Sequence, residues 1–280
     1  MRLGRLKRGA RPKPVPQRRR LGLALGGGAA RGAAHLGVLA VLEREGIVPD
    51  VVSGVSAGAV VGAGVAAGVP AAEMLEAFGK SSWLRMAVPA WLSKLSMFDS
   101  SPLGALIEKV TAVNDFDGLR LPLAVLACDL LTGDEVVITS GPLREAVVAS
   151  SAIPGLFAPV RRGDQLLVDG QLLVNVPVQA ALDLGADYIV GVDIMPPPVE
   201  SAEPAELRDV ILMSWDIMQR RLQADGLSPD LMVTPAVGGI SPWDFLHMTD
   251  AYDAGFSAME KALPRLRADL GLNGDIPPVR

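Results

Sequence analysis

Gly54-Val55-Ser56-Ala57-Gly58 stands between an apolar run, Val48 to Val52, and a run of small residues, Ala59 to Val69. This order predicts a buried strand, a sharp turn at the serine and a helix. At such a turn the serine hydroxyl projects from a strained backbone, and only very small residues fit on either side. We therefore expect the serine to be a nucleophile. An ordinary turn serine is the alternative, because short matches also arise by chance in a chain with 30 glycines.

A second glycine-rich turn, Gly26-Gly27-Gly28-Ala29-Ala30-Arg31-Gly32, follows a short apolar strand at Leu21–Leu25 and begins an amphipathic helix at Ala29–Glu45. Such a turn offers backbone N–H groups at the positive end of a helix, which suits an anion. The anion could be a dinucleotide pyrophosphate or the oxyanion of acyl transfer. A dinucleotide site needs an acidic residue at the end of the second strand, whereas Asp50 stands at its beginning. We therefore favour an oxyanion hole.

The base that would take the serine proton must be found elsewhere in the chain. The only two histidines are His35, inside the first predicted helix, and His247, in an aromatic segment near the end. Neither has the glycine-rich loop setting of a mobile catalytic imidazole, although a Ser–His–Asp triad stays an alternative. We favour Asp169, because it ends the predicted strand Gln165–Val168 and strand carboxyl ends gather ligands in open α/β sheets. A turn-forming aspartate before Gly170 is the structural alternative.

Strand-like and helix-like segments alternate along most of the chain. Further strands are expected at Val48–Ser53, Leu123–Leu130, Glu135–Thr139, Tyr188–Asp193 and Asp230–Thr234. Further helices are expected at Ala71–Phe78, Ser101–Val110, Pro142–Ser150, Val176–Leu184, Glu206–Gln223 and Asp250–Leu270, with a loop at Pro196–Pro198. Continuous apolar strands are typical of parallel sheets, so we expect an α/β fold with helices on both sheet faces. We expect residues 21–280 to form a single domain.

The positive charge of the chain is concentrated at its start. Residues 1–20 contain nine of the 26 Lys and Arg residues and no acidic residue, which leaves 17 basic against 31 acidic side chains in residues 21–280. Interspersed prolines make a flexible, solvated tail the simplest interpretation. The functional alternative is electrostatic contact with anionic lipid headgroups. The acidic remainder argues against nucleic acid as a partner.

Two other features concern the compartment. The tail lacks the apolar core of a secretory signal, and the long uncharged stretch after Asp50 is better interpreted as strand, turn and helix, so we expect no transmembrane segment. A lone Cys128 excludes an internal disulfide, which favours a reducing, cytoplasmic location.

Residues 82–98 contain two of the four tryptophans. They predict either core packing or an acyl-binding lid, and with the tail they could contact a membrane peripherally.

Together these motifs resemble those of the patatin-like phospholipase family, in particular its small bacterial members. The resemblance rests on Gly26–Gly32 with Arg31, Gly54–Gly58 and Asp169-Gly170, with further landmarks at Ser151–Pro154, Phe157, Asn175 and Pro177. It covers roughly residues 21–260. It implies a three-layer α/β/α fold and a Ser–Asp dyad, with Ser56 as nucleophile and Asp169 as base. Members hydrolyse acyl esters of lipids without a metal or other cofactor.

One position departs from the family pattern, because Gln171 follows Gly170 where the family usually has glycine or alanine. If a tiny side chain or a positive φ is required there, the dyad geometry would suffer. The expected oxyanion donors are the amides of Gly26, Gly27, Gly28 and Ala29. Because the ordinary aspartate pKa is about 3.9, these donors would have to supply much of the rate. Arg31 either orients a phosphate or anchors the loop, and we favour the anchor.

Other functions fit parts of the same pattern. The dyad could transfer an acyl group to an alcohol instead of water. The glutamine and the basic tail would also fit a catalytically weak protein that binds lipid or membrane. A nicotinamide or flavin enzyme is the third alternative. The sequence leaves the head group, the acyl length and the oligomeric state open.

Overall fold

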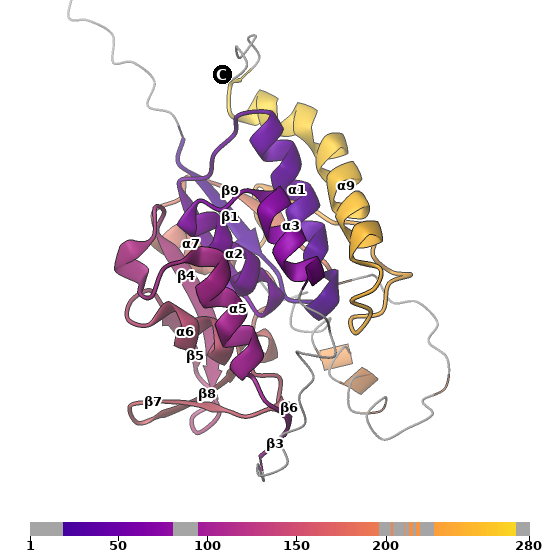
Figure 1. Ribbon diagram of the computed structural model, residues 1–280. Coiled ribbons are helices and arrows are strands. Elements are labelled where there is room, and N and C mark those ends of the chain that lie inside the picture. The colour runs from indigo at the N-terminus through magenta and orange to yellow at the C-terminus, as the bar shows by residue number, and fades with distance from the viewer. Residues whose placement is uncertain are drawn as a thin grey trace, which may run out of the picture.

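The computed structural model describes residues 19–80, 95–195 and 227–272, together with residues 203, 210, 213, 214, 217 and 218. Several predicted segments lie outside the described residues: the tail up to residue 18, residues 82–94, the loop Pro196–Pro198 and most of the helix Glu206–Gln223. In the described ranges helices and strands alternate, as the apolar pattern predicts (Figure 1).

The centre of the molecule is a sheet whose neighbouring strands are mostly parallel. Across it run β10 (Leu231–Val233), β9 (Tyr188–Val192), β1 (Leu21–Leu25), β2 (Val51–Val55) and β4 (Leu123–Asp129), all parallel to their neighbours. Every residue of β1, β2, β4 and β9 is buried, which explains why their sequences are apolar runs without alternation. The predicted α/β fold with a mainly parallel sheet is confirmed.

Antiparallel strands complete the sheet beside β4. They are β5 (Glu135–Ile138), β7 (Val160–Arg162) and β8 (Gln165–Asp169), and β8 pairs with both β4 and β7. β5 and β8 both pair with Ala127 and Cys128, so they must flank β4 on opposite edges. β2 pairs with β4 residues that also pair with β5, so β2 shares an edge with β8. The carboxyl ends of β2 and β8 therefore meet head to head along one edge of β4.

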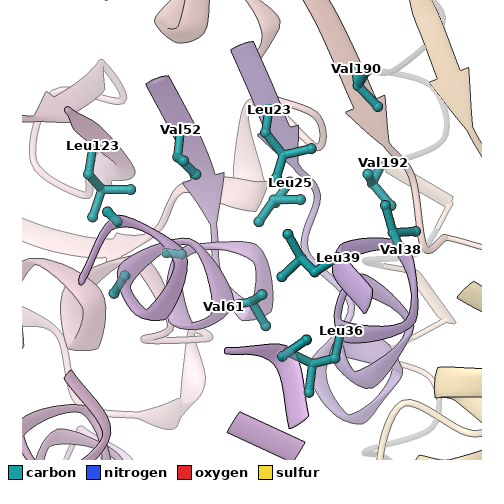
Figure 2. Close-up of a cluster of buried hydrophobic side chains, with 14 of the residues drawn as sticks. Leu23, Leu25, Leu36, Val38, Leu39, Val52, Val61, Leu123, Val190 and Val192 are labelled. Atoms are coloured by element: carbon teal, nitrogen blue, oxygen red, sulfur yellow. The ribbon is translucent and has the colours of Figure 1, made fainter. Parts of the chain in front are cut away.

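Helices cover both faces of the sheet. On one face α1 (Ala33–Arg44) and α2 (Ala57–Ala67) pack on the strands, and Figure 2 shows Leu23, Leu25 and Val52 facing them in this core. The alternate side chain Ala24 of β1 faces the opposite way and packs with α7 (Val178–Asp183). The long helix α9 (Met248–Asp269) lies along α1 on the outside (Figure 1).

The remaining helices are α3 (Ala71–Lys80), α5 (Ser101–Thr111) and α6 (Leu143–Ser150). β3 (Ser96–Phe98) and β6 (Gly155–Phe157) form a separate two-stranded sheet that the sequence pattern does not predict. No helix within the described ranges is both long enough and apolar enough to span a bilayer.

Two element boundaries near the site differ from prediction. The second strand begins at Val51 rather than Val48, because Pro49 has no N–H for strand pairing and the Asp50 carboxylate accepts from Leu21 N. The strand thus continues to Val55 and delivers Ser56 directly to the turn. The first helix begins with a separate 3₁₀ turn, Ala29–Gly32, because Ala29 adopts a positive φ of 51°.

Candidate active site

Ser56 occupies the turn between β2 and α2 with φ 52° and ψ −123°. This backbone conformation is unfavourable for any residue with a side chain, so the surroundings must impose it. The Ser150 hydroxyl accepts from Ser56 N at 2.9 Å, and the Ser56 carbonyl accepts from Ala59 N at 2.9 Å. The serine is only 4% exposed, yet it lines a pocket described below. These features are those of a nucleophile elbow.

The glycines around the turn are required by close backbone approach. A Cβ on Gly54 would overlap the Gly58 carbonyl, and a Cβ on Gly58 would overlap the carbonyl oxygen of Leu25 in β1. A Cβ on Gly32 would lie 3.0 Å from the Ala57 Cβ. The elbow therefore packs against the strand that carries the glycine-rich loop, which brings the two motifs together.

We expect Gly58→Ala to lower the free energy of unfolding by more than about 3 kcal/mol, because the new methyl group meets backbone atoms that cannot move aside. Urea unfolding of the purified variant measures this loss. Gly79→Ala is the matched control: Gly79 is an exposed residue of α3 with nothing within 4 Å of an added Cβ. Helix propensity predicts a gain of up to about 1 kcal/mol there. Equal stability of the two variants would contradict the close packing.

Asp169 reaches the turn because β2 and β8 meet head to head. Val55, the last residue of β2, pairs with Leu126, and Asp169, the last residue of β8, pairs with the next residue, Ala127. The residue after Val55 is Ser56, so the serine and the aspartate become neighbours although they are far apart in sequence. The sequence analysis placed Asp169 near the site because strand carboxyl ends gather ligands in open, mainly parallel sheets. This reason is wrong, because β8 runs antiparallel to β4.

The Asp169 carboxyl is fully buried, with 0% exposure. Its Oδ1 accepts from Gln171 N at 2.9 Å. Burial raises its pKa to about 7, while the Gln171 N–H and the adjacent Ser56 hydroxyl oppose that rise. The hydroxyl lies beside the carboxyl without the alignment of a full hydrogen bond, so Oδ2 has no aligned partner among the described residues. Catalytic hydrogen bonds often align only when substrate is bound.

The raised pKa corrects one expectation from the sequence. An aspartate with its ordinary pKa would be a poor base for an alcohol, whereas a carboxylate with a pKa of about 7 accepts a proton more readily. The buried environment of Asp169 therefore makes this carboxyl a better candidate base than the sequence alone indicates.

The glycine-rich loop offers unpaired amides, but not from Gly26. Gly26 N donates to Val192 O at 3.0 Å, because β1 continues its pairing with β9 through this residue. The prediction that Gly26 supplies an oxyanion donor is therefore wrong. In the described part of the chain, the N–H groups of Gly27, Gly28 and Ala29 have no acceptor. Gly28 and Ala29 have φ values of 160° and 51°, which suits an anion-binding turn.

Ala57 is a further donor that the sequence analysis missed. As the first residue of α2 it has no helical acceptor, and none is present among the described residues. Its position directly after the serine is where nucleophile elbows place an oxyanion donor. Ser150 was missed as well, because nothing in its local sequence indicates that its hydroxyl supports a turn so far away.

The two histidines take other roles. His35 is completely buried, and its Nε2 lies 2.8 Å from the carbonyl oxygen of Gly26. Burial lowers its pKa to about 4, so near neutral pH the ring is uncharged and Nε2–H donates to that carbonyl. The buried ring therefore supports the glycine-rich loop from inside the fold. His247 is exposed and pairs with Asp244.

Arg31 anchors the segment that follows β10. Its Nε donates to Ile240 O at 2.7 Å, and Ala30 N donates to Pro242 O at 2.9 Å. These bonds hold the chain that leads to the start of α9 against the glycine-rich loop. The arginine is 9% exposed, so its head group is largely enclosed in the fold. This placement agrees with the anchoring role that the sequence favours.

An apolar pocket of about 130 Å³ opens at Ser56. Ala29 and Ala57 stand beside the serine in its wall, and Asp169 lies buried behind it. Most of the apolar lining comes from α2, α3, α5, the segment after α6 that includes β6, and the segment between β10 and the start of α9. These lining residues are Val60, Val61, Phe78, Leu103, Leu106, Ile153, Phe157, Trp243, Phe245 and Met248. The last three residues come from a part of the sequence that carries no motif.

Residues 23–182 match the family described as "Patatin-like phospholipase", which is more than half of the chain. The chain belongs to this family. The patatin-like motifs recognised in the sequence thus fall on the elbow, the glycine-rich loop and the β8 carboxyl end, which the fold brings together.

Relatives of the patatin-like chain include an "Uncharacterized NTE family protein" of Mycobacterium tuberculosis, 37% identical over 196 residues. That match covers 66% of this chain and 52% of the relative. "Lysophospholipase NTE1" of Debaryomyces hansenii is 28% identical over 71% of this chain and 13% of its own length. The chain spans about half the length of the mycobacterial relatives it matches.

Among solved structures, VipD from Legionella pneumophila has a similar fold, with a TM-score of 0.54 and 13% sequence identity. The match covers 89% of this chain and 67% of VipD. At this identity the likeness concerns the fold alone, and it agrees with the α/β architecture of the patatin-like chain.

Proposed function

We propose that this protein is a serine acyl-ester hydrolase that acts on lipids, of phospholipase A, lysophospholipase or esterase type. Ser56 is the nucleophile, Asp169 is the base, and residues 21–280 form the hydrolase domain. One observation carries the proposal. A serine held at a strained turn lines an apolar pocket and lies beside a buried carboxyl whose pKa is raised to about 7.

The geometry supports a two-step mechanism. Asp169 takes the hydroxyl proton as Ser56 Oγ attacks the ester carbonyl carbon, and the new C–O bond yields a tetrahedral oxyanion. The amides of Gly27, Gly28, Ala29 and Ala57 are the donors available to that oxyanion. Protonated Asp169 then gives its proton to the departing alkoxide and leaves an acyl-enzyme. Asp169 next takes a proton from water as the water oxygen attacks the acyl carbon. The C–O bond to Ser56 then breaks, Asp169 returns the proton to the departing Ser56 Oγ, and the fatty acid is released.

The pocket supports a fatty-acyl substrate. Apart from Ser56 and Ser151 its lining residues are apolar, so burying an acyl chain there removes apolar surface from water on both partners. Family membership and the name of the yeast relative, a lysophospholipase, point to the same substrate class. Peripheral membrane contact through residues 1–20 and 82–98 stays a prediction.

The test combines covalent labelling with product analysis. The wild-type protein is treated with a fluorophosphonate probe, and the labelled peptide is identified by mass spectrometry. Untreated protein is incubated with phospholipid or lysophospholipid vesicles, with and without an alcohol acceptor. Label on Ser56 and release of free fatty acid support hydrolysis. A new acyl ester in place of free acid indicates acyl transfer. Absence of both label and product overturns the hydrolase assignment, and co-sedimentation with the vesicles in that case would indicate a lipid-binding protein.

Val60→Phe is expected to narrow acyl selectivity, because Val60 lines the pocket one helical turn after Ser56. We expect kcat/KM for a decanoyl ester to fall about tenfold or more, with little change for an acetyl ester. Kinetics across p-nitrophenyl esters of increasing chain length measure the effect. Val60→Ala is the reciprocal control and should shift the preference towards longer chains. Parallel losses across all lengths would contradict an acyl-binding role for the pocket.

A further inference from the structure

Gln171 connects the two halves of the candidate site. Its backbone N–H donates to Asp169 Oδ1 at 2.9 Å. Its side chain is buried, with 6% exposure, and its Nε2 donates to Asn175 Oδ1 at 3.1 Å. Gln171 does not adopt a positive φ, so the backbone at this position does not require glycine. The departure from the family pattern is therefore compatible with the dyad.

The side-chain bonds continue to a buried carboxylate and have a fixed direction. Asn175 Nδ2 donates to Asp193 Oδ1 at 2.9 Å, and the same oxygen accepts from Met195 N at 2.9 Å. Because Asp193 Oδ1 is the acceptor of the Met195 N–H, Asn175 presents its amide nitrogen to Asp193 and its oxygen to Gln171. Gln171 must then donate with Nε2. This direction leaves the Gln171 oxygen on the side of Gly27.

The side-chain amides of Gln171 and Asn175 pack against the backbone of the glycine-rich loop. The space that a Cβ on Gly27 would occupy lies 2.6 Å from Gln171 Cδ, so the glutamine amide rests against the Gly27 backbone. A Cβ on Gly26 would similarly lie 3.4 Å from Asn175 Oδ1. Asn175 is buried at 3% exposure, so on this side the loop is supported by enclosed side chains.

We propose that Gln171 is a positioning residue for the hydrolysis. Its backbone holds the base, and its side chain, fixed by Asn175 and Asp193, holds the loop whose amides face the oxyanion. The inference rests on the proposed function, because it concerns the relative placement of Asp169 and those amides. We therefore expect loss of the hydrogen bond from Gln171 Nε2 to Asn175 to weaken stabilisation of the transition state more than it weakens substrate binding.

The test compares Gln171→Met with Gln179→Met. Methionine keeps most of the volume at 171 but cannot donate to Asn175. Gln179 is exposed on α7, and its bond to Asp183 is unrelated to the site. On a p-nitrophenyl ester we expect Gln171→Met to lower kcat about 10- to 100-fold with KM within about threefold. The variant should fold with a lower melting temperature, because the buried Asn175 Oδ1 loses its donor. Gln179→Met should match the wild type.

Asp193→Ala is the second variant, because it leaves Gln171 and Asn175 in place and removes the oxygen that accepts from Asn175 Nδ2. Without this acceptor the direction of the two amides is no longer fixed. We expect a fall in kcat in the same sense as for Gln171→Met. If Gln171→Met does not fold, this variant decides the question.

The outcomes separate this inference from the proposed function. If the wild type neither labels at Ser56 nor cleaves the ester, both fall. If the wild type is active and both folded variants keep kcat within about twofold of Gln179→Met, only the positioning role falls. A rise in KM with unchanged kcat would also overturn it, because that pattern indicates lost uniform substrate binding.

Discussion

Replacing Ser56 by alanine is expected to lower kcat on a p-nitrophenyl ester by at least about 10⁴-fold, because no acyl-enzyme can form without the hydroxyl. The fluorophosphonate label should disappear as well. Alanine faces the same positive φ of 52° and fits within the same turn, so unfolding by urea should change little. Loss of activity at unchanged stability separates a chemical role from a structural one.

The matched control is Ser140→Ala. Ser140 is exposed, and only its carbonyl oxygen, which the substitution keeps, accepts from Arg162. Turnover and labelling should equal those of the wild type. Unchanged turnover in Ser56→Ala, or label found on another serine, would remove the nucleophile assignment and with it the proposed mechanism.

Asp169→Asn is expected to lower kcat about 10²- to 10⁴-fold, because an amide cannot accept the serine proton. In the wild type kcat/KM should rise with pH and reach a plateau above about pH 7, since the buried carboxyl must lose its proton before it acts as base. The asparagine variant should lack this rise. A pH series of initial rates on one ester measures both effects.

Asp169→Asn is expected to lose activity but to gain stability relative to the wild type as the pH rises. The folded-state pKa of Asp169 is raised from 3.8 to about 7, so the folded protein holds this proton more tightly than the unfolded chain. Its contribution is complete below about pH 4 and is lost as pH rises towards 7. Asparagine is neutral throughout. The stability of Asp169→Asn relative to the wild type should therefore increase across this window and stay constant above it.

His247→Gln is the control for the pH series. His247 is exposed, and the next residue, Met248, lines the pocket. The rise of kcat/KM should persist in His247→Gln if Asp169 causes it. A rise that persists in Asp169→Asn, or that vanishes in His247→Gln, would show that another group is the base.

Local pattern was enough to predict the motif positions and most of the elements, although β3, β6 and β7 were missed. Ser56 follows a buried apolar run and precedes small residues, so strand, turn and helix could be predicted without tertiary information. The carboxyl end of β8 was predicted in the same way. These features depend on neighbours in the chain, and for that reason the sequence shows them.

The availability of individual amides could not be predicted in this way. Gly26 and Gly27 are adjacent and identical in type, yet Gly26 N pairs with Val192 O and Gly27 N has no acceptor in the described ranges. The difference arises where β1 stops pairing with β9. Likewise, only the folded environment of Asp169 raises its pKa, because burial depends on segments distant in sequence.

The sequence by itself determined which residues are the candidates for the proposed chemistry: a serine at a sharp turn, a glycine-rich loop and an aspartate at a strand end. Only the tertiary structure decided how they meet. β8 runs against β4 and ends head to head with β2, which places Asp169 beside Ser56. The direction and register of β2 and β8 come from their pairing with β4, a segment distant in sequence from both, so the strand-like runs taken one by one do not show them.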